Sequence, residues 1–459
     1  EFIVIFLAVL FCAALTYMQF WYKGLGVKLS GLAIGCIGFC LLLFLMLMRF
    51  PLGFTMCFIG LLGLFAVMRS PVAVMKAVAT IPYTQTATFI MIALPMFMLM
   101  GDMVTMAGLS HDIFNAAQKW MGRLPGGLAI AAVGGCAGFG AVCGDSMATA
   151  IAMSSVSLPA MRENGYNMSL ACGSLAAGGT LGILIPPSMG FIVYSMVTEV
   201  SVGKLFISGI LPGIVLAAIF CSIIFFQVIR HPDWAPKTGS APFKEKIAAL
   251  IGLIPVLILF LVVVIGILRG WFTPAEGGAL GAVMAIIYAA IRRQLSWKSF
   301  SKTLINCTVM FGKMFALFIG LSVFNVFLAT SRLPNLLATT VANLQVSPYV
   351  ILVCVIILYI FLGCVMNIMP MMILTLPSIF PTIIAIGFDP VWFGCLCVIV
   401  MEMGQITPPV GLNVFTLASI ASDVPMASIF KGVLPFFCGM LLCVLLVVLF
   451  PQLAMYLLD

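Results

Sequence analysis

Two proline pairs, at 186–187 and 408–409, interrupt long apolar stretches of this chain. Proline has no backbone N–H, and it disfavours helical geometry in the residue before it, so we expect Ile185 and Thr407 to be extended. Each pair then leaves carbonyls unpaired at the end of one half-helix and amides unpaired at the start of the next. Such carbonyls suit a small hard cation such as sodium, whereas the amides suit an anion.

Polar residues that could complete these sites lie upstream of each proline pair. GFGAVCGDSMATA at 138–150 places Asp145 and Ser146 among glycines, and LGCVMNIMPM at 362–371 places Asn367 similarly. We interpret each stretch as the tip of a hairpin that enters and leaves on one side. Asp145 has two interpretations, because a carboxylate there could cap a helix or bind a cation directly.

Two further acids have different expected roles. Glu402 lies in the apolar stretch VIVMEMG just before the second proline pair, which favours either a buried acid for cations or protons or a role in helix packing. Glu276 in TPAEG follows Thr273 by three residues with a proline between them. This pattern predicts a capping box with a structural role.

The composition indicates that these residues belong to an integral membrane protein. Of 459 residues, 64% are hydrophobic and 7% are charged, and the mean hydropathy is +1.28. A bilayer core of about 30 Å needs about 20 apolar residues per helix, and 29–48, 247–268 and 433–449 with its flanks are such runs. Residues 29–67 could be one kinked passage or two short ones. These runs are apolar on every face, which predicts an all-α polytopic protein and disfavours a barrel of alternating strands.

The distribution of charged residues and cysteines excludes several other classes of protein. The net charge is +8, but the basic residues gather at the ends of apolar runs, notably in 230–246 and 292–302, which disfavours nucleic acid as a partner. Two helix-length runs separate these loops, so we expect both to be cytoplasmic. The 15 cysteines lack zinc-type spacing, so we expect no transition metal. A phosphate-binding loop is absent and GDSMA matches a nucleophile elbow only partially, so we expect no enzyme and no organic cofactor.

The two halves of the sequence resemble each other at a shift of 222 positions. This shift superposes the proline pairs and brings five further residues of the first half onto the second: Gly182 onto Gly404, Pro159 onto Pro381, Gly165 onto Gly387, Tyr166 onto Phe388 and Asp145 onto Asn367. Paired interrupted helices are typical of secondary transporters, whose binding site lies between the repeats near the bilayer midplane. We expect residues 36–230 and 247–459 to be two repeats, joined by a polar, cytoplasmic linker at 231–246. Residues 1–35 form an expected extra N-terminal membrane helix.

Several motifs in family order resemble the large membrane subunit of tripartite ATP-independent periplasmic (TRAP) transporters. The first half carries LPAMRENGY and GGTLGILIPPSMG, and the second carries FTPAEGGALGAV and GQITPPVGLNVF. The resemblance covers roughly residues 37–450. It implies inverted repeats with re-entrant hairpins, an elevator mechanism, and sodium-coupled import of a small organic anion such as a carboxylate or sulfonate across a prokaryotic inner membrane. The implied partners are a small membrane subunit, expected as a separate chain, and a periplasmic substrate-binding protein.

Combined with the proline breaks, this resemblance assigns three groups of site residues. For a first sodium site we predict Asp145, Ser146, Gly179, Gly182, Leu184 and Pro187. For a second sodium site we predict Asn367, Glu402, Gly404, Thr407 and Pro409. For the organic anion we predict Thr180, Ser188, Gly411 and Asn413.

The chain departs from the family pattern at three of these positions. Asp145 stands where small or hydroxyl residues are common, Asn367 where an acid is frequent, and Glu402 where an amide is frequent. The alternative that these acids suggest is a proton-coupled carrier, or one independent of a binding protein. A channel or a structural membrane subunit is a third possibility.

Overall fold

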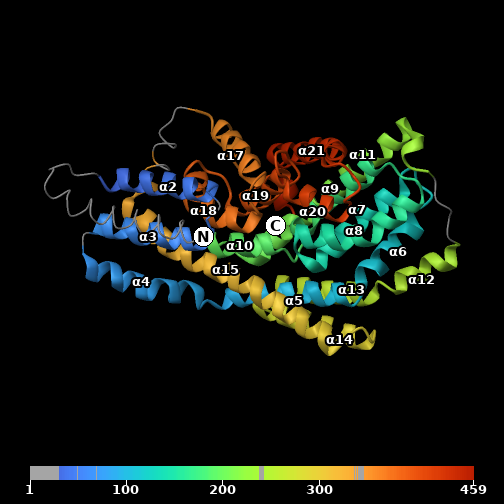
Figure 1. Ribbon diagram of the computed structural model, residues 1–459, viewed down its shortest axis with the longest axis horizontal. Coiled ribbons are helices and arrows are strands. Elements are labelled where there is room, and N and C mark those ends of the chain that lie inside the picture. The colour runs from blue at the N-terminus through green and yellow to red at the C-terminus, as the bar shows by residue number, and fades with distance from the viewer. Residues whose placement is uncertain are drawn as a thin grey trace. The chain divides into compact units, whose positions relative to one another are not determined.

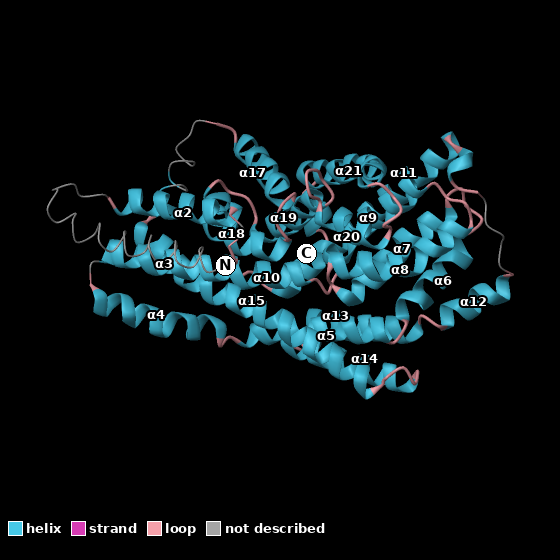
Figure 2. Cartoon of the chain, in the orientation of Figure 1, coloured by secondary structure: helices cyan, strands magenta, loops and turns pink. Residues whose placement is uncertain are grey.

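The computed structural model describes residues 30–458 except 49, 69, 237–241, 335, 337, 338 and 340–345. Every regular element in these residues is a helix, and Figure 2 shows helices joined by loops. The prediction of an all-α protein is therefore confirmed. Most of the N-terminal helix expected at 1–35, and part of the linker expected at 231–246, fall outside the described residues.

The described helices, most of them labelled in Figure 1, follow one another without an intervening strand. The first half contains α2 (Gly31–Leu47), α3 (Leu52–Met68), α4 (Pro71–Thr86), η1 (Phe89–Ile92), α5 (Ala93–Met106), α6 (Leu109–Met121), α7 (Gly127–Cys143), α8 (Ser146–Glu163), α9 (Met168–Leu184), α10 (Met189–Thr198), α11 (Val202–Arg230) and η2 (Pro232–Trp234). The second half contains α12 (Phe243–Ile251), α13 (Ile254–Leu268), α14 (Pro274–Ile291), α15 (Trp297–Ser331), α17 (Pro348–Gly363), α18 (Ile368–Ala385), α19 (Pro390–Gln405), α20 (Leu412–Ile420), α21 (Met426–Leu449) and α22 (Gln452–Met455).

Six of the described helical stretches are long and apolar enough to cross a membrane. They are η1 with α5, α11, α14, α15, α18 and α21. A seventh crossing arises if α9 and α10, which are bent by 45° at a short break, count as one span. Shorter apolar helices, including α7, α17 and α19, lie between them. The protein is therefore a multi-pass integral membrane protein.

Two of the apolar runs can be compared with the sequence-based expectations. The run 247–268 was expected to be one helix, and the stretch 29–67 either one kinked passage or two short ones. The run 247–268 is divided into α12 and α13 near Gly252, because Pro255 is favourable only in the first turn of a new helix. The described part of the stretch 29–67 forms two helices, α2 and α3, which pack against each other. Pro51 directly precedes α3, which explains why the chain turns there.

The capping box predicted at the start of α14 is confirmed. Thr273 Oγ1 accepts from the Glu276 amide at 3.3 Å, and Glu276 Oε2 accepts from the Thr273 amide at 2.8 Å. Pro274 occupies the first position of the helix, where its missing N–H costs nothing. Glu276 therefore has the structural role expected from its spacing.

The described chain divides into two compact units. Unit 1 comprises residues up to 88 with 310–346 and 373–387, and within it Gly53 of α3 lies directly on Gly320 of α15. Unit 2 comprises 89–309, 347–372 and 388–459. At its centre α9 packs against α7, α8, α11 and α21, and residues 170–184 are all buried. Every predicted site residue belongs to unit 2.

The helix bounds around the two breaks recur 222 positions later to within one residue. Helices α8, α9 and α10 correspond in this way to α18, α19 and α20. The capping residues correspond too, because Asn167 caps α9 by accepting from two backbone amides and Asp389 caps α19 in the same manner. Gly165 and Gly387, each just before its cap, both have positive φ values.

Contacts within unit 2 fix the relative directions of the two broken helices. At the start of α9, Ser169 donates to Ser428 at the start of α21 at 2.6 Å. At the start of α19, the Trp392 indole donates to Val447 at the end of α21 at 2.9 Å. Helix α21 thus begins beside the start of α9 and ends beside the start of α19. The two broken helices therefore begin at opposite ends of α21.

Candidate functional site

The first break has the geometry expected from its proline pair. Helix α9 ends at Leu184, and Ile185 is extended with φ −81° and ψ 126°. The Pro186–Pro187 peptide is cis, and α10 starts at Met189. The whole break is buried except for Ile185, which is half-buried. The change of direction is thus enclosed by protein, as irregular backbone within a bilayer would need to be.

Hydrogen bonds tie this break to the tip of the first hairpin. The Met189 amide donates to the Gly144 carbonyl at 3.1 Å. The Ser188 hydroxyl donates to the Ile183 carbonyl and accepts from the Phe191 amide at 3.3 Å. Ser188 is therefore the N-cap of α10 and also satisfies one of the carbonyls that the break releases. The predicted contact of Ser188 with an anion would be made by a hydroxyl that already has two hydrogen-bond partners.

Glycines let the hairpin oxygens approach α9 closely. A Cβ added at Gly182 would lie 2.4 Å from Thr149 Oγ1 and 2.8 Å from the Asp145 carbonyl oxygen. A Cβ added at Gly179 would lie 3.0 Å from the Ser146 carbonyl oxygen. Thr149 is fully buried and its hydroxyl has no hydrogen-bond partner. The first predicted site is therefore a cradle of oxygens with an unsatisfied hydroxyl in it.

The other predicted residues of the first break lie around this cradle. Asp145 is the N-cap of α8 and accepts from the Ala148 amide at 2.7 Å, so its capping interpretation is confirmed. The Pro187 carbonyl oxygen would lie 2.6 Å from a Cβ at Gly144. Leu184 is buried at the end of α9, and the Thr180 hydroxyl donates to the Ala177 carbonyl within the helix. This hydrogen bond of Thr180 is thus internal to α9.

The second break repeats several of these contacts. The Gly411 amide donates to the Cys364 carbonyl at 3.2 Å, and Gly411 lies 222 positions after Met189, the donor at the first break. Gly404 of α19 lies on Gly363 of α17, as Gly182 lies on Gly140 of α7. Thr407 donates to the Met403 carbonyl at 2.5 Å. The breaks differ in burial, because Pro409 is exposed whereas Pro187 is buried.

Buried polar side chains without full hydrogen bonding gather at the second break. Glu402 is 1% exposed, and one of its carboxyl oxygens, Oε2, accepts from the Asn413 amide at 3.5 Å. The other oxygen has no partner, nor does the Asn413 carbonyl oxygen or either polar atom of the Gln405 side chain. Among the described residues no cation pairs with Glu402. An unpaired buried carboxylate is costly, and a positive ligand or a proton would remove that cost.

The two hairpin tips and the second break converge. The Ser146 side chain approaches the Glu402 carboxyl group, and Asp145 is near enough to act on it electrostatically. Asn367 caps α18 by accepting from the Met369 amide, and its amide nitrogen lies 3.3 Å from Met147 Sδ. Residues predicted for two separate cation sites thus lie around one centre.

Sequence reasoning missed two members of this centre. Thr149 looked like one of many small residues in SMATAIAMSS, and Gln405 like an ordinary helix residue before a turn. The available signal was spacing, because Thr149 lies one helical turn after Asp145 and Gln405 lies three residues after Glu402. Both side chains are therefore on the same helix face as a residue that was predicted.

A family model and individual relatives agree on the class of protein. Residues 39–453 match the model described as "Tripartite ATP-independent periplasmic transporter, DctM component". The chain is 30% identical over 398 residues to the C4-dicarboxylate TRAP transporter large permease protein DctM of Pseudomonas aeruginosa, covering 86% of this chain and 92% of that protein. It is 28% identical over 410 residues to the sialic acid TRAP transporter large permease protein SiaM of Vibrio cholerae, covering 88% and 93%. It is 29% identical over 399 residues to the isethionate TRAP transporter permease protein DctMQ of Oleidesulfovibrio alaskensis, covering 87% of this chain and 62% of that longer protein.

The fold is also shared with solved membrane transporters of distant sequence. The YdaH transporter of Alcanivorax borkumensis matches with a TM-score of 0.57 at 13% identity, over 84% of this chain and 89% of that one. The MtrF protein of Neisseria gonorrhoeae matches with a TM-score of 0.51 at 12% identity, over 83% and 82%. These likenesses concern the fold alone. The match to the family model over most of the chain shows that this protein belongs to the TRAP transporters, as their large membrane permease component.

Proposed function

We propose that this permease imports a small organic anion coupled to sodium, with the anion delivered by a periplasmic substrate-binding protein and with a small membrane subunit as its second partner. The observation that carries the proposal is the buried Glu402 carboxyl group beside Ser146. This carboxyl group lies where the second break meets the first hairpin. Among the described residues, no cationic side chain pairs with it. A bound sodium ion would supply the missing positive charge.

The described oxygens fit sodium by their chemistry. Sodium is a hard cation that prefers carbonyl, hydroxyl and carboxylate oxygens, as calcium and magnesium do. At the first break these would be the Thr149 hydroxyl and the carbonyls of Asp145 and Ser146. At the second break they would be the free carboxyl oxygen of Glu402 and the Asn413 carbonyl oxygen. Each of these three side-chain groups is buried and has an oxygen without a hydrogen-bond partner.

The sodium ions would also make the site acceptable to an anion. Asp145 and Glu402 repel a carboxylate or sulfonate at short range, and that repulsion is strong where water is excluded. A cation bound beside each acid reverses this effect, so occupancy by sodium favours binding of the anion. Helices α10 and α20 start at the breaks, so the positive ends of their helix dipoles would favour an anion there.

The relatives support the substrate class. Their names refer to C4-dicarboxylates, isethionate and sialic acid. All three are small organic anions that carry a carboxylate or a sulfonate. We extend this class to the present chain without choosing a member of it.

We further propose that the two repeats are inverted and that unit 2 moves as an elevator. The recurrence of helix bounds after 222 positions supports the repeats. The opposite placement of the starts of α9 and α19 along α21 supports the inversion. All predicted site residues belong to unit 2, so one moving body could carry the whole site.

The membrane potential would add to the driving force for such transport. Each net positive charge that moves inward across 100 mV releases about 2.3 kcal/mol. This equals roughly 50-fold accumulation of the solute at 1.4 kcal/mol per factor of ten. More sodium charges than substrate charges must therefore move with each solute.

The experiment is uptake into proteoliposomes that contain the permease and its small subunit, with the binding protein added outside. A thermal-shift screen of the binding protein against carboxylates and sulfonates first identifies the anion to be labelled. We expect uptake to require both the binding protein and an inward sodium gradient, and to increase with an inside-negative potential. Equimolar potassium in place of sodium is the matched control.

Three outcomes would contradict the proposal. Uptake that continues unchanged without a sodium gradient would remove the coupling. Uptake that follows a pH gradient and ignores sodium would identify a proton-coupled carrier instead. A solute that equilibrates but never accumulates would indicate a channel.

A further inference from the structure

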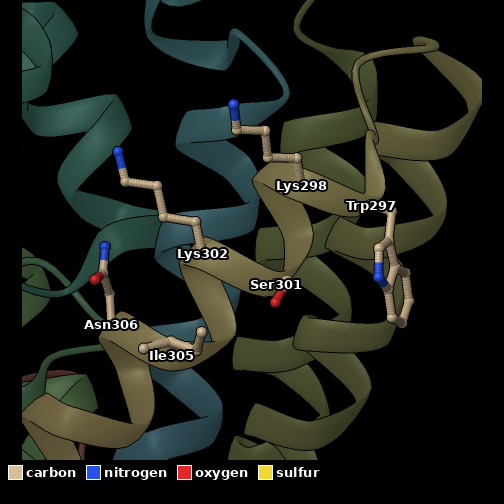
Figure 3. Close-up of a pocket in the computed structure, with 6 residues that line it drawn as sticks. All are labelled: Trp297, Lys298, Ser301, Lys302, Ile305 and Asn306. Carbon is tan, nitrogen blue, oxygen red and sulfur yellow. The ribbon is translucent and has the colours of Figure 1, made fainter.

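A charged surface groove lies far along the sequence from the transport site, on the first turns of α15. Figure 3 shows its six lining residues, all from this helix: Trp297, Lys298, Ser301, Lys302, Ile305 and Asn306. Its volume is about 460 Å³. Helix α15 has 35 residues and is a candidate membrane span. It is longer than the about 20 residues that cross the hydrocarbon core, so its first turns can extend into the headgroup region.

Two rows of side chains form the groove. Lys298, Lys302 and Asn306 follow one another at intervals of four residues and extend to the same side of the helix in Figure 3. Trp297 and Ile305 belong to the neighbouring row and are 81% and 59% exposed. A cationic and amide row therefore runs beside a row in which two large apolar side chains, Trp297 and Ile305, flank Ser301.

The two lysines have no carboxylate partner in the described part of the chain. Nearby basic residues do have one, because Arg292 pairs with Asp112 at 2.8 Å and Lys119 pairs with Glu245 at 3.7 Å. Lys298 and Lys302 are one helical turn apart, so their like charges repel each other. They also lie in the first turns of α15, where the helix dipole disfavours positive charge. An anion in the groove would relieve both effects.

The side of the membrane and the apolar row indicate which anion. The stretch 292–302 is one of the two basic loops that the positive-inside rule assigns to the cytoplasmic face. Anionic phospholipids give this leaflet its negative surface potential. Exposed tryptophan is typical of the headgroup level, and Ile305 lies about 12 Å further along the helix axis, at 1.5 Å per residue. A soluble anion would use the lysines but would gain nothing from Trp297 and Ile305.

We propose that this groove binds an anionic phospholipid, with its phosphate between Lys298 and Lys302 and an acyl chain along the row of Trp297 and Ile305. Asn306 can donate to the glycerol or phosphate oxygens one turn deeper. The ligand differs from the transported solute in both chemistry and position. The site therefore concerns how the permease is held in its bilayer.

The test is native mass spectrometry of the purified permease, titrated with phosphatidylglycerol and, separately, with phosphatidylethanolamine. We expect the wild-type protein to prefer phosphatidylglycerol by roughly 10- to 30-fold, as two juxtamembrane lysines would give. The variant Lys298→Ala/Lys302→Ala should lose this preference, whereas Lys298→Arg/Lys302→Arg should keep it. The matched control is Arg230→Ala/Lys244→Ala, which removes two exposed charges elsewhere and should keep the preference.

Several results would overturn the proposal. One is an unchanged preference in the double alanine variant, and another is equal binding of both lipids by the wild-type protein. Displacement of the lipid by low millimolar inorganic phosphate would identify a site for a soluble anion. If the double alanine variant instead released the small membrane subunit while binding both lipids as the wild type does, the groove would be a protein interface.

Discussion

The side-chain amide of Asn413 donates to the Glu402 carboxyl group across the second break, with 3.5 Å between Nδ2 and Oε2. This contact is long, both residues are buried, and the other carboxyl oxygen has no partner. Ser146 of the first hairpin approaches the same carboxyl group. An incompletely satisfied acid therefore lies at the point where the two halves of the sequence meet, and it is the most informative residue to change.

Glu402→Gln should lower sodium-driven uptake at least about tenfold, because it replaces a charged ligand worth about 1.5–3 kcal/mol by a neutral one of the same shape. Thermal stability should be unchanged or higher, since a buried unpaired charge is removed. Initial uptake rates at several sodium concentrations measure the effect. Glu276→Gln is the matched control, because glutamine also completes a capping box and should leave the sodium dependence unaltered. A Glu402→Gln permease with wild-type sodium dependence would exclude this acid from coupling.

The substitution Thr149→Val tests whether the Thr149 hydroxyl binds sodium. The hydroxyl is buried and has no partner, so its removal should cost no stability and can even increase it. If the hydroxyl binds sodium, the sodium concentration for half-maximal uptake should nevertheless rise several-fold. Ser154→Ala removes another buried, unpartnered hydroxyl from α8 and should leave that concentration unchanged. Equal effects of the two substitutions would argue against a specific role for Thr149.

Gly182→Ala should abolish transport and destabilise the protein by about 1–3 kcal/mol, the usual cost of overpacking a closed site. The added methyl group would lie 2.4 Å from Thr149 Oγ1, so α9 and the hairpin would have to separate. Gly134→Ala on the hairpin is the control, because it meets nothing within 4 Å. Alanine there should be neutral or stabilise α7 by up to about 1 kcal/mol. Uptake by Gly182→Ala at the wild-type rate would show that the close approach is unnecessary.

The ion pair between Arg162 and Asp423 should contribute little to stability. It is bidentate, at 2.6 and 2.9 Å, but both side chains are at least half exposed. A double-mutant cycle with Arg162→Ala and Asp423→Ala, measured by thermal unfolding, should give a coupling energy of about 0.2–1 kcal/mol. The coupling should fall when salt is added. A coupling energy well above this range would indicate that the ion pair stabilises the packing of the first repeat against the second within unit 2.

The sequence predicted the features that depend on local chemistry. The break after Leu184 follows from the steric effect of a proline pair, and the capping box of Thr273 and Glu276 follows from a spacing of three. The cap at Asp145 is equally local. Such features need only residues that are close in the chain, so a single sequence contains them.

The convergence of the two sites could not be predicted in this way. Ser146 and Glu402 are 256 positions apart, and no local pattern encodes their proximity. Thr149 is polar, but small hydroxyl residues are also common in packed membrane helices, so its type alone did not distinguish it. The split of 247–268 was missed because a proline in an apolar run can begin a helix as well as kink one.

The caps at the two hairpin tips have a practical consequence. Asp145 and Asn367 occupy corresponding positions, and each accepts from a backbone amide at the start of its helix. Aspartate and asparagine are almost equivalent as N-caps, so exchanging one for the other preserves the helix start. The formal charge near Glu402 can therefore be adjusted in single steps while the backbone stays fixed. Charge variants at positions 145 and 367 can therefore be compared without redesigning either hairpin.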